Sequence, residues 1–176
     1  WYLLAQAPHI RAQLRQEAVA ALGDRMPTTD DLERMPLGGQ VFDEALRLYP
    51  PAWLITRKAI AADEVGGVQV APGSLVILSP YVIHRHPQFW RTPLAFDPAR
   101  FSPGQDRERP RYAYIPFGGG ARLCIGNNFA TIEARLIMAM IVRRFDLDLL
   151  PGEDVIVDAL VTLRPRGGLQ MRLTPV

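Results

Sequence analysis

The sequence predicts a mainly α-helical fold with small β-sheets, of the α+β class, and three observations support this prediction. Apolar residues recur at helical spacing in three separate stretches, 8–22, 38–51 and 127–145. Short apolar stretches with glycine-rich turns, at 53–61 and 66–79, are typical of β-hairpins. Between these hairpins and the last helix, residues 87–116 are rich in proline and aromatic residues and show no period, so we expect an ordered irregular loop.

The N-terminal third is predicted to be helical. A helix over 8–22 begins at a proline and is followed by a glycine that ends it. Its apolar face consists of Ile10, Leu14 and Leu22. Within 27–35, Thr28 or Thr29 is the expected cap of a short helix with acidic residues in its first turn. Two prolines end the third helix, over 38–51.

The C-terminal third is predicted to contain one long helix and a hairpin. The helix over 127–145 has an apolar stripe formed by Phe129, Ile132, Leu136 and Met140. Arg143 and Arg144 lie in its last turn, where positive charge suits the helix dipole. The tail, 155–176, is expected to form two strands around a turn at Gly167–Gly168.

Length and composition limit the class of protein. With 176 residues, the chain is expected to form a single partial domain over 1–176. No stretch is apolar and long enough to predict a membrane span, and a single cysteine suits a reducing compartment, so we expect a cytoplasmic protein. The net charge is only +2, and nucleic-acid binding needs a clustered basic face, so no nucleic-acid partner is expected. The small arginine clusters, expected at the surface, are Arg107, Arg109 and Arg111, and Arg143 and Arg144.

The single cysteine, Cys124, lies in the stretch FGGGARLCIG at 117–126. It comes just before the long helix, whose positive N-terminal end favours a thiolate. Gly118, Gly119 and Gly120 have no Cβ, so their backbone can approach a bulky ligand closely. The pattern suits a sulfur held as an anionic ligand.

The residues alone also allow other interpretations of this stretch. A lone cysteine is commonly a small buried hydrophobe, and a Cys–His nucleophile also stays open. A phosphate-binding loop is excluded because no Lys-Ser/Thr follows the glycines. A dinucleotide fingerprint is excluded because Leu123 stands where the third glycine belongs. Structural zinc lacks a second cysteine, and His84 and His86 cannot complete four ligands.

The stretch 117–126 resembles, position for position, the cysteine-ligand loop of the cytochrome P-450 family. The resemblance implies the C-terminal part of that fold and a haem b whose iron is bound by the Cys124 thiolate. Cys124 is therefore the implied metal ligand and catalytic residue. The implied cofactor-binding residues are Phe117, Gly118, Gly120, Arg122, Cys124 and Gly126, with Arg57 and Arg122 as partners of the haem propionates.

Three further stretches agree with this resemblance. EALR looks like the family's Glu-x-x-Arg helix and gives Glu44 and Arg47; FDPARF resembles the loop whose arginine, here Arg100, completes a triad with that pair. IHRHPQFW resembles the run that precedes this loop. Periodicity alone predicts that Glu44 and Arg47 form a solvated stripe with Gln40 and Asp43, whereas the resemblance implies that the loop carrying Arg100 covers them. The implied substrate-pocket residues are Trp53, Leu54, Ile55, Leu160 and Val161.

The resemblance implies a haem-thiolate monooxygenase that inserts one oxygen atom of O2 into a small organic substrate. Electrons would come from a ferredoxin or a flavoprotein reductase. The family's long oxygen-activating helix has no counterpart here, so the chain is expected to begin just past it and to be a poor enzyme alone; an upstream membrane anchor stays open. The alternatives are a thiolate-haem peroxygenase or isomerase, and a haem-free remnant that acts as a structural or binding module.

Overall fold

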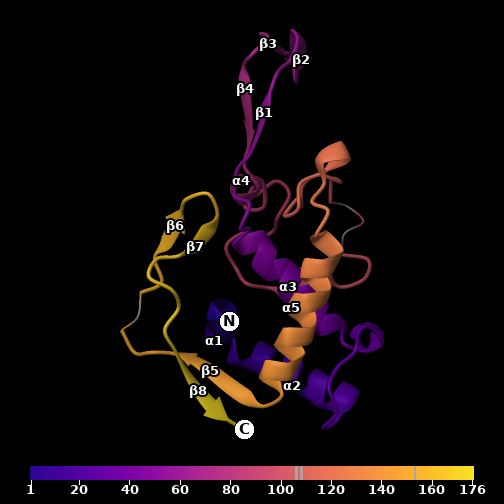
Figure 1. Cartoon of the computed structure of the whole chain (residues 1–176), viewed down its shortest axis with the longest axis vertical. Helices are drawn as coiled ribbons and strands as arrows, with labels where there is room; N and C mark the ends of the chain where they lie inside the picture. Colours follow the sequence, from indigo (N-terminus) through magenta and orange to yellow (C-terminus); the bar gives the residue numbers. More distant parts are fainter. Residues whose placement is uncertain (106, 108, 153) are drawn as a thin grey trace.

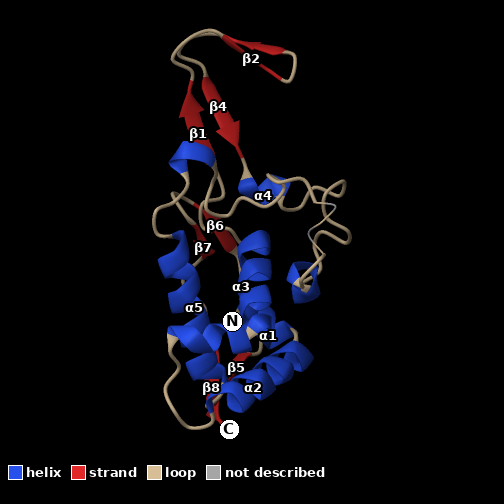
Figure 2. Cartoon of the chain, turned by 90° about the vertical axis from the view of Figure 1, so that its right-hand side faces the viewer, coloured by secondary structure: helices blue, strands red, loops and turns tan. Residues whose placement is uncertain are grey.

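The structure is a computed structural model that describes residues 1–105, 107, 109–152 and 154–176. The main helices gather at one end of an elongated molecule, and a β arm protrudes from the other end (Figures 1 and 2). The α-helices within the described residues are α1 (Tyr2–Gln6), α2 (Pro8–Leu22), α3 (Pro36–Leu48), α4 (Pro80–Ile83) and α5 (Asn127–Val142). Short 3₁₀ helices are η1 (Thr29–Arg34), η2 (Pro98–Phe101) and η3 (Gly120–Arg122). The mixture of helices and small sheets confirms the predicted fold class.

The N-terminal helices follow the sequence signals closely. Helix α2 has the predicted bounds, its three predicted apolar residues are buried, and Gly23 ends it with a φ of +54°. Thr28 is the cap of η1 and forms a capping box with Asp31. Helix α3 begins at Pro36, two residues earlier than predicted. Its first backbone N–H groups, at Leu37 and Gly38, donate to the Glu17 carboxylate at 2.8 and 3.1 Å, so a side chain of α2 caps α3.

The hydrophobic core lies where α1, α2, η1, α3 and α5 meet. Its buried residues are Leu4, Ala7, Ile10, Leu14, Ala18, Ala21, Leu22, Leu32, Met35, Val41, Ala139 and Val142. The predicted stripe of α5 is partly wrong. Ile132 and Leu136 pack against this core, but Phe129, in the first turn of α5, is 70% exposed.

The strands of the described residues pair as four two-stranded antiparallel sheets. Their bounds are β1 (Ile55–Lys58), β2 (Asp63–Val65), β3 (Val68–Val70), β4 (Leu75–Leu78), β5 (Phe145–Leu149), β6 (Val157–Ala159), β7 (Leu163–Pro165) and β8 (Met171–Pro175). Strand β1 pairs with β4, and β2 with β3, so one hairpin is nested within the other. Together these four strands form the protruding arm (Figure 1).

The predicted tail hairpin around Gly167–Gly168 is wrong. Strand β6 pairs with β7 around residues 160–162, and β8 leaves that hairpin to pair with β5. Strand β5 alternates apolar and acidic residues, FDLDL, and is anchored from α2: Arg15 donates to Asp146 at 2.6 Å. The last strand of the tail therefore closes back onto the helical end instead of pairing within the tail.

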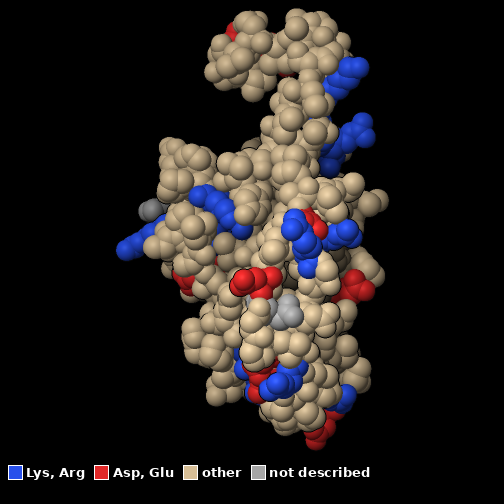
Figure 3. Space-filling view, turned by 90° about the vertical axis from the view of Figure 1, so that its left-hand side faces the viewer, with Lys and Arg blue, Asp and Glu red and all other residues tan. Residues whose placement is uncertain are grey.

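The arginine clusters are only partly at the surface. Arg143 is 9% exposed and donates to the backbone oxygens of Gly23 and Arg25 at 2.6 and 2.7 Å. The guanidinium of Arg109 lies 4.2 Å from the ring centre of Trp90. On the face in Figure 3, basic side chains form separate groups among uncharged and acidic ones. Among the described residues, the helices are too short or too polar to cross a membrane.

Candidate functional site

A buried ion pair lies on the C-terminal half of α3. Arg47 Nε and Nη2 donate to the two carboxylate oxygens of Glu44 at 2.7 and 2.8 Å, and both side chains are fully buried. Residues three apart on a helix lie on one face, which explains the pairing but not the burial. The solvated stripe predicted from periodicity is therefore wrong for these two residues.

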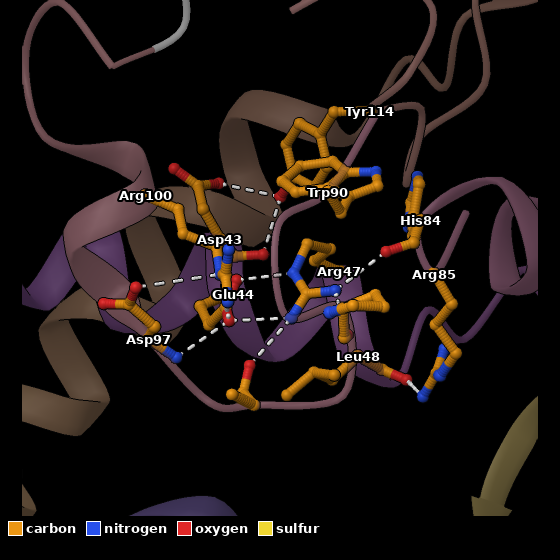
Figure 4. Close-up of polar contacts among 12 residues, drawn as sticks. Asp43, Glu44, Arg47, Leu48, His84, Arg85, Trp90, Asp97, Arg100 and Tyr114 are labelled. Atoms are coloured by element: carbon orange, nitrogen blue, oxygen red, sulfur yellow. Dashed lines mark hydrogen bonds and ion pairs between the residues drawn. The ribbon is translucent and has the colours of Figure 1, made fainter. Parts of the chain in front are cut away.

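The irregular segment after β4 covers this pair. The remaining donors of Arg47 reach the backbone oxygens of His84 at 2.8 Å, Pro93 at 2.7 Å and Ala95 at 3.0 Å (Figure 4). The Trp90 ring lies 5.0 Å from the Arg47 guanidinium carbon. A buried guanidinium is thus fully bonded to one carboxylate and three carbonyls, as burial of a charge requires.

Arg100 approaches the pair from the same segment. Its Nε lies 3.4 Å from a carboxylate oxygen of Glu44, and its two Nη atoms donate to the backbone of Arg91 and Thr92. Glu44 also accepts from the backbone N–H of Asp97 at 2.9 Å. The structure therefore brings together the three residues Glu44, Arg47 and Arg100 around one carboxylate.

The cysteine loop joins the irregular segment to α5. The backbone N–H of Cys124 donates to the Phe117 oxygen at 3.0 Å, which closes the loop, and the cysteine is exposed. Gly118 and Gly120 have φ angles of +78° and +67°, which residues with a Cβ rarely adopt. At Gly119, a Cβ would lie 3.1 Å from the Tyr112 ring, so this exposed ring would have to shift by a few tenths of an ångström. Gly126 is the N-cap of α5.

A hollow of about 500 Å³ lies beside this loop and collects several of the predicted residues. It is lined by Phe42, Leu46, Pro51, Ala52, Ile55, Arg57, Pro116, Phe117, Gly118, Arg122, Cys124, Ala130, Glu133 and Ala134. The wall is mostly apolar and includes two arginines, Arg57 and Arg122, and one acidic residue, Glu133. Arg57 donates to the oxygen of Thr56; the described residues offer the Arg122 guanidinium no hydrogen bond or ion pair.

The remaining predicted residues are not part of this hollow. Gly120 and Gly126 shape the loop beside it. Trp53 Nε1 donates to the Leu160 oxygen at 2.8 Å, which links the segment before β1 to the turn between β6 and β7. Leu160 and Val161 are 54% and 97% exposed on that turn, and Leu54 is 37% exposed. Of the predicted substrate residues, Ile55 is the one that lines the hollow.

Two buried polar contacts next to the pair were missed by sequence reasoning. The Tyr114 hydroxyl donates to the Asp43 carboxylate at 3.1 Å; burial raises the pKa of both groups above their usual values. His84 is fully buried, and burial lowers the pKa of its imidazole to about 4, with the Arg47 and Arg85 charges acting in the same direction. The run IHRHPQFW was a signal for this region, but nothing in it distinguishes a buried histidine from an exposed one.

Comparison with known proteins identifies the class of protein. The sequence matches the cytochrome P-450 family over residues 1–168. It is 40% identical to cyclooctatin synthase of Streptomyces melanosporofaciens over 176 residues, which is all of this chain and 37% of that protein. It is 36% identical to pentalenene oxygenase of Streptomyces avermitilis, over 99% of this chain and 39% of that protein. The chain thus spans about two fifths of the length of these relatives.

Solved structures agree. A retinoic-acid-bound cyanobacterial CYP120A1 superposes with a TM-score of 0.93 and 34% identity, over 99% of this chain and 40% of that one. The chain belongs to the cytochrome P-450 family, whose characteristic cofactor is a haem bound through a cysteine thiolate.

The residues around Cys124 fit this cofactor. A Cβ built on Gly118 would lie 3.7 Å from both Ile55 Cδ1 and the Arg122 oxygen, two residues that line the hollow, so the glycine keeps this space free. The apolar wall suits a porphyrin face, and the two arginines suit its carboxylates. Leu123 and Ile125, beside the exposed sulfur, are themselves 49% and 102% exposed, which leaves apolar surface available for contact.

Proposed function

We propose that this chain provides the cysteine-ligand side of a haem-thiolate monooxygenase that inserts one oxygen atom of O2 into an organic substrate. The observation that carries the proposal is the exposed Cys124 beside a hollow that Arg57 and Arg122 also line. A haem held by a cysteine thiolate supplies electron donation that favours cleavage of the O–O bond. Membership in the family supports this assignment.

In this proposal, the residues around the hollow bind and orient haem b. Cys124 is the iron ligand and the catalytic residue, and the glycines of 118–120 let the backbone lie close to the porphyrin. Arg57 and Arg122 form charge-assisted hydrogen bonds with the propionates. Apolar side chains such as Phe42 and Leu46 exclude water from the site, which strengthens these charge interactions.

Glu44, Arg47 and Arg100 have a structural role in the proposal. The fully bonded Arg47 ties α3 to the irregular segment at three carbonyls, and this segment continues directly into the cysteine loop. The ion pair thereby fixes the position of the backbone that leads into the loop of Cys124, the proposed iron ligand.

The substrate is proposed to be a small, largely apolar organic molecule. One structural neighbour holds retinoic acid, and one relative is named for oxygenation of pentalenene. The segment of Trp53, Leu54 and Ile55 and the turn of Leu160 and Val161 are joined by the Trp53–Leu160 hydrogen bond, so both are candidates for one substrate-pocket wall.

The electron donor is proposed to be a ferredoxin or a flavoprotein reductase, guided by exposed arginines such as Arg107 and Arg111. Rates of electron transfer that do not change with ionic strength would contradict this guidance. A cytoplasmic location, a single domain and the lack of a nucleic-acid partner remain predictions.

The test is a Cys124→Ser substitution in the full-length, haem-loaded protein. We expect the variant to lose the thiolate signature in the spectrum of the reduced, carbon-monoxide-bound form and to lose turnover with O2 and an electron donor. Ile60→Ser, which introduces the same residue at a fully exposed position of the arm, is expected to match the wild type. A Cys124→Ser variant with the wild-type spectrum and turnover would contradict the proposal. Turnover that requires hydrogen peroxide and does not depend on the electron donor would indicate the peroxygenase alternative.

A further inference from the structure

His84 connects the buried ion pair to the segment that leads into the cysteine loop. Its backbone oxygen accepts from Arg47 Nη1 at 2.8 Å, and its side-chain Nε2 accepts from the backbone N–H of Ile115 at 2.8 Å. The residue is fully buried and lies beside Arg47 in Figure 4. One residue thus holds both contacts, on its main chain and on its ring.

The contact with Ile115 determines the protonation state of the ring. A nitrogen that accepts a hydrogen bond from a backbone N–H carries no proton, so the neutral imidazole has its proton on Nδ1. Burial lowers the pKa of this imidazole to about 4, which keeps the ring neutral at pH 7. Within the described part of the chain, the buried Nδ1 has no hydrogen bond of normal geometry, but backbone oxygens of Leu46 and Arg47 favour a proton on the ring. Because Nε2 accepts from Ile115, that proton belongs on Nδ1.

Ile115 leads directly into the cysteine loop. Its oxygen accepts from the Gly118 N–H at 3.0 Å, and the Phe117 oxygen accepts from the Cys124 N–H at 3.0 Å. A continuous series of hydrogen bonds and short backbone links therefore runs from Arg47 through His84 to Cys124.

A second contact fixes the same segment against the same helix. The Tyr114 ring lies 5.2 Å from the His84 ring, and its hydroxyl donates to Asp43, the neighbour of Glu44. The Trp90 ring lies 6.4 Å from His84 in an edge-on arrangement and 6.2 Å from the Tyr114 ring, so the two aromatic rings pack against the imidazole from neighbouring directions. Full burial and these two rings leave the imidazole little freedom to turn away from Ile115.

We propose that His84 is a positioning residue, which sets the place of the Cys124 loop relative to the buried Glu44–Arg47 pair by accepting a hydrogen bond from Ile115. The expected effect of His84 on haem binding rests on the proposed function, but the hydrogen bond between His84 and Ile115 is a property of the polypeptide itself. The competing explanation is that His84 only fills space among the aromatic rings.

Two substitutions in the full-length protein separate these explanations. His84→Phe keeps an aromatic ring and removes the acceptor, whereas His84→Gln keeps an acceptor at a similar distance from the backbone and removes the ring. For His84→Phe, we expect amide hydrogen exchange in the segment 113–119 and haem release to be about tenfold faster, because a buried N–H loses its partner. His84→Gln is expected to restore both rates to within about threefold of the wild type. Exchange in α2 serves as the internal control and is expected to stay unchanged. A phenylalanine variant that matches the wild type, or a glutamine variant no better than the phenylalanine variant, overturns the proposal.

A measurement on the unmodified protein tests the same proposal if the variants fail to fold. Nitrogen NMR of the imidazole in the reduced, carbon-monoxide-bound protein is expected to find a neutral ring at pH 7 with its proton on Nδ1. A proton on Nε2, or a charged ring, overturns the proposal. The Cys124→Ser variant distinguishes a failure of this proposal from a failure of the proposed function. If His84 acts as proposed, the amides of segment 113–119 stay protected from hydrogen exchange in that variant whether or not it binds haem.

Discussion

Removing the carboxylate of Glu44 is predicted to destabilise the protein severely. In Glu44→Gln, the shape is nearly kept, but the fully buried Arg47 loses its counter-charge. Arg100, which is 9% exposed, keeps only the Asp97 carboxylate, 3.9 Å from its Nε. Breaking a buried ion pair by removing one partner costs about 3–5 kcal/mol, because the remaining charge stays out of water. Domains are typically stable by only about 5–15 kcal/mol, so this loss is a large part of the total.

The assay is urea unfolding of the full-length, haem-loaded protein, followed by circular dichroism. With a urea dependence of about 1–3 kcal/mol per molar, the midpoint is expected to fall by at least about 1 M. The matched control is Asp158→Asn, which removes the carboxylate from an ion pair of the same 2.7 Å length whose arginine, Arg166, is 63% exposed. That exposed pair is expected to contribute less than about 1 kcal/mol. If the two variants lose similar amounts of stability, burial does not make the Glu44 carboxylate important, and our account of the pair is wrong.

Three further predictions address the loop, the histidine and the helix cap. Gly118→Ala is expected to cost about 1–2 kcal/mol, because a φ of +78° is strained for a residue with a Cβ; a melting temperature and a haem content equal to the wild type would argue against this strain. The stability of the wild type relative to His84→Gln is expected to fall by about 3 kcal/mol as the pH falls from 6.5 to about 4. The sign of this change follows because the pKa of the His84 imidazole is lower in the folded state than in the unfolded state. The contribution of His84 to stability is therefore complete above pH 6.5 and is lost as the pH falls, because acid protonates the imidazole of the unfolded state first. Urea unfolding across this range measures it, and a difference independent of pH contradicts it. Glu17→Ala is expected to cost about 1 kcal/mol, because the N–H groups of Leu37 and Gly38 lose their shared acceptor; an unchanged urea midpoint would mean that water replaces this cap without loss.

Local signals predicted most of the helices because those signals act within a few residues. The proline start and glycine end of α2 depend on backbone torsions of single residues, and the cap of η1 depends on Thr28 and Asp31 only three positions apart. The glycines at 118 and 120 likewise have the positive φ angles that their residue type suggested.

Strand pairing was harder to predict because it depends on partners far along the chain. The segments around Gly167–Gly168 have the composition of a hairpin, but β8 pairs instead along the whole of β5. Strand β5 is held in place by Arg11 and Arg15 of α2, more than 120 positions earlier. No local pattern in the tail contains that information.

The burial of Glu44 and Arg47 shows the same limit at the site itself. A carbonyl inside a helix or a sheet is already bonded within that element, so it is a poor acceptor for a distant side chain. The carbonyls of Pro93 and Ala95 lie in backbone without such an element and are free to accept from Arg47. An arginine that is buried with every donor bonded therefore needs carbonyls that are not already paired, and this covering segment supplies two of them. The periodicity of α3 describes only the helix and cannot reveal this cover, whereas the family resemblance could, because it relates positions about fifty residues apart in one pattern.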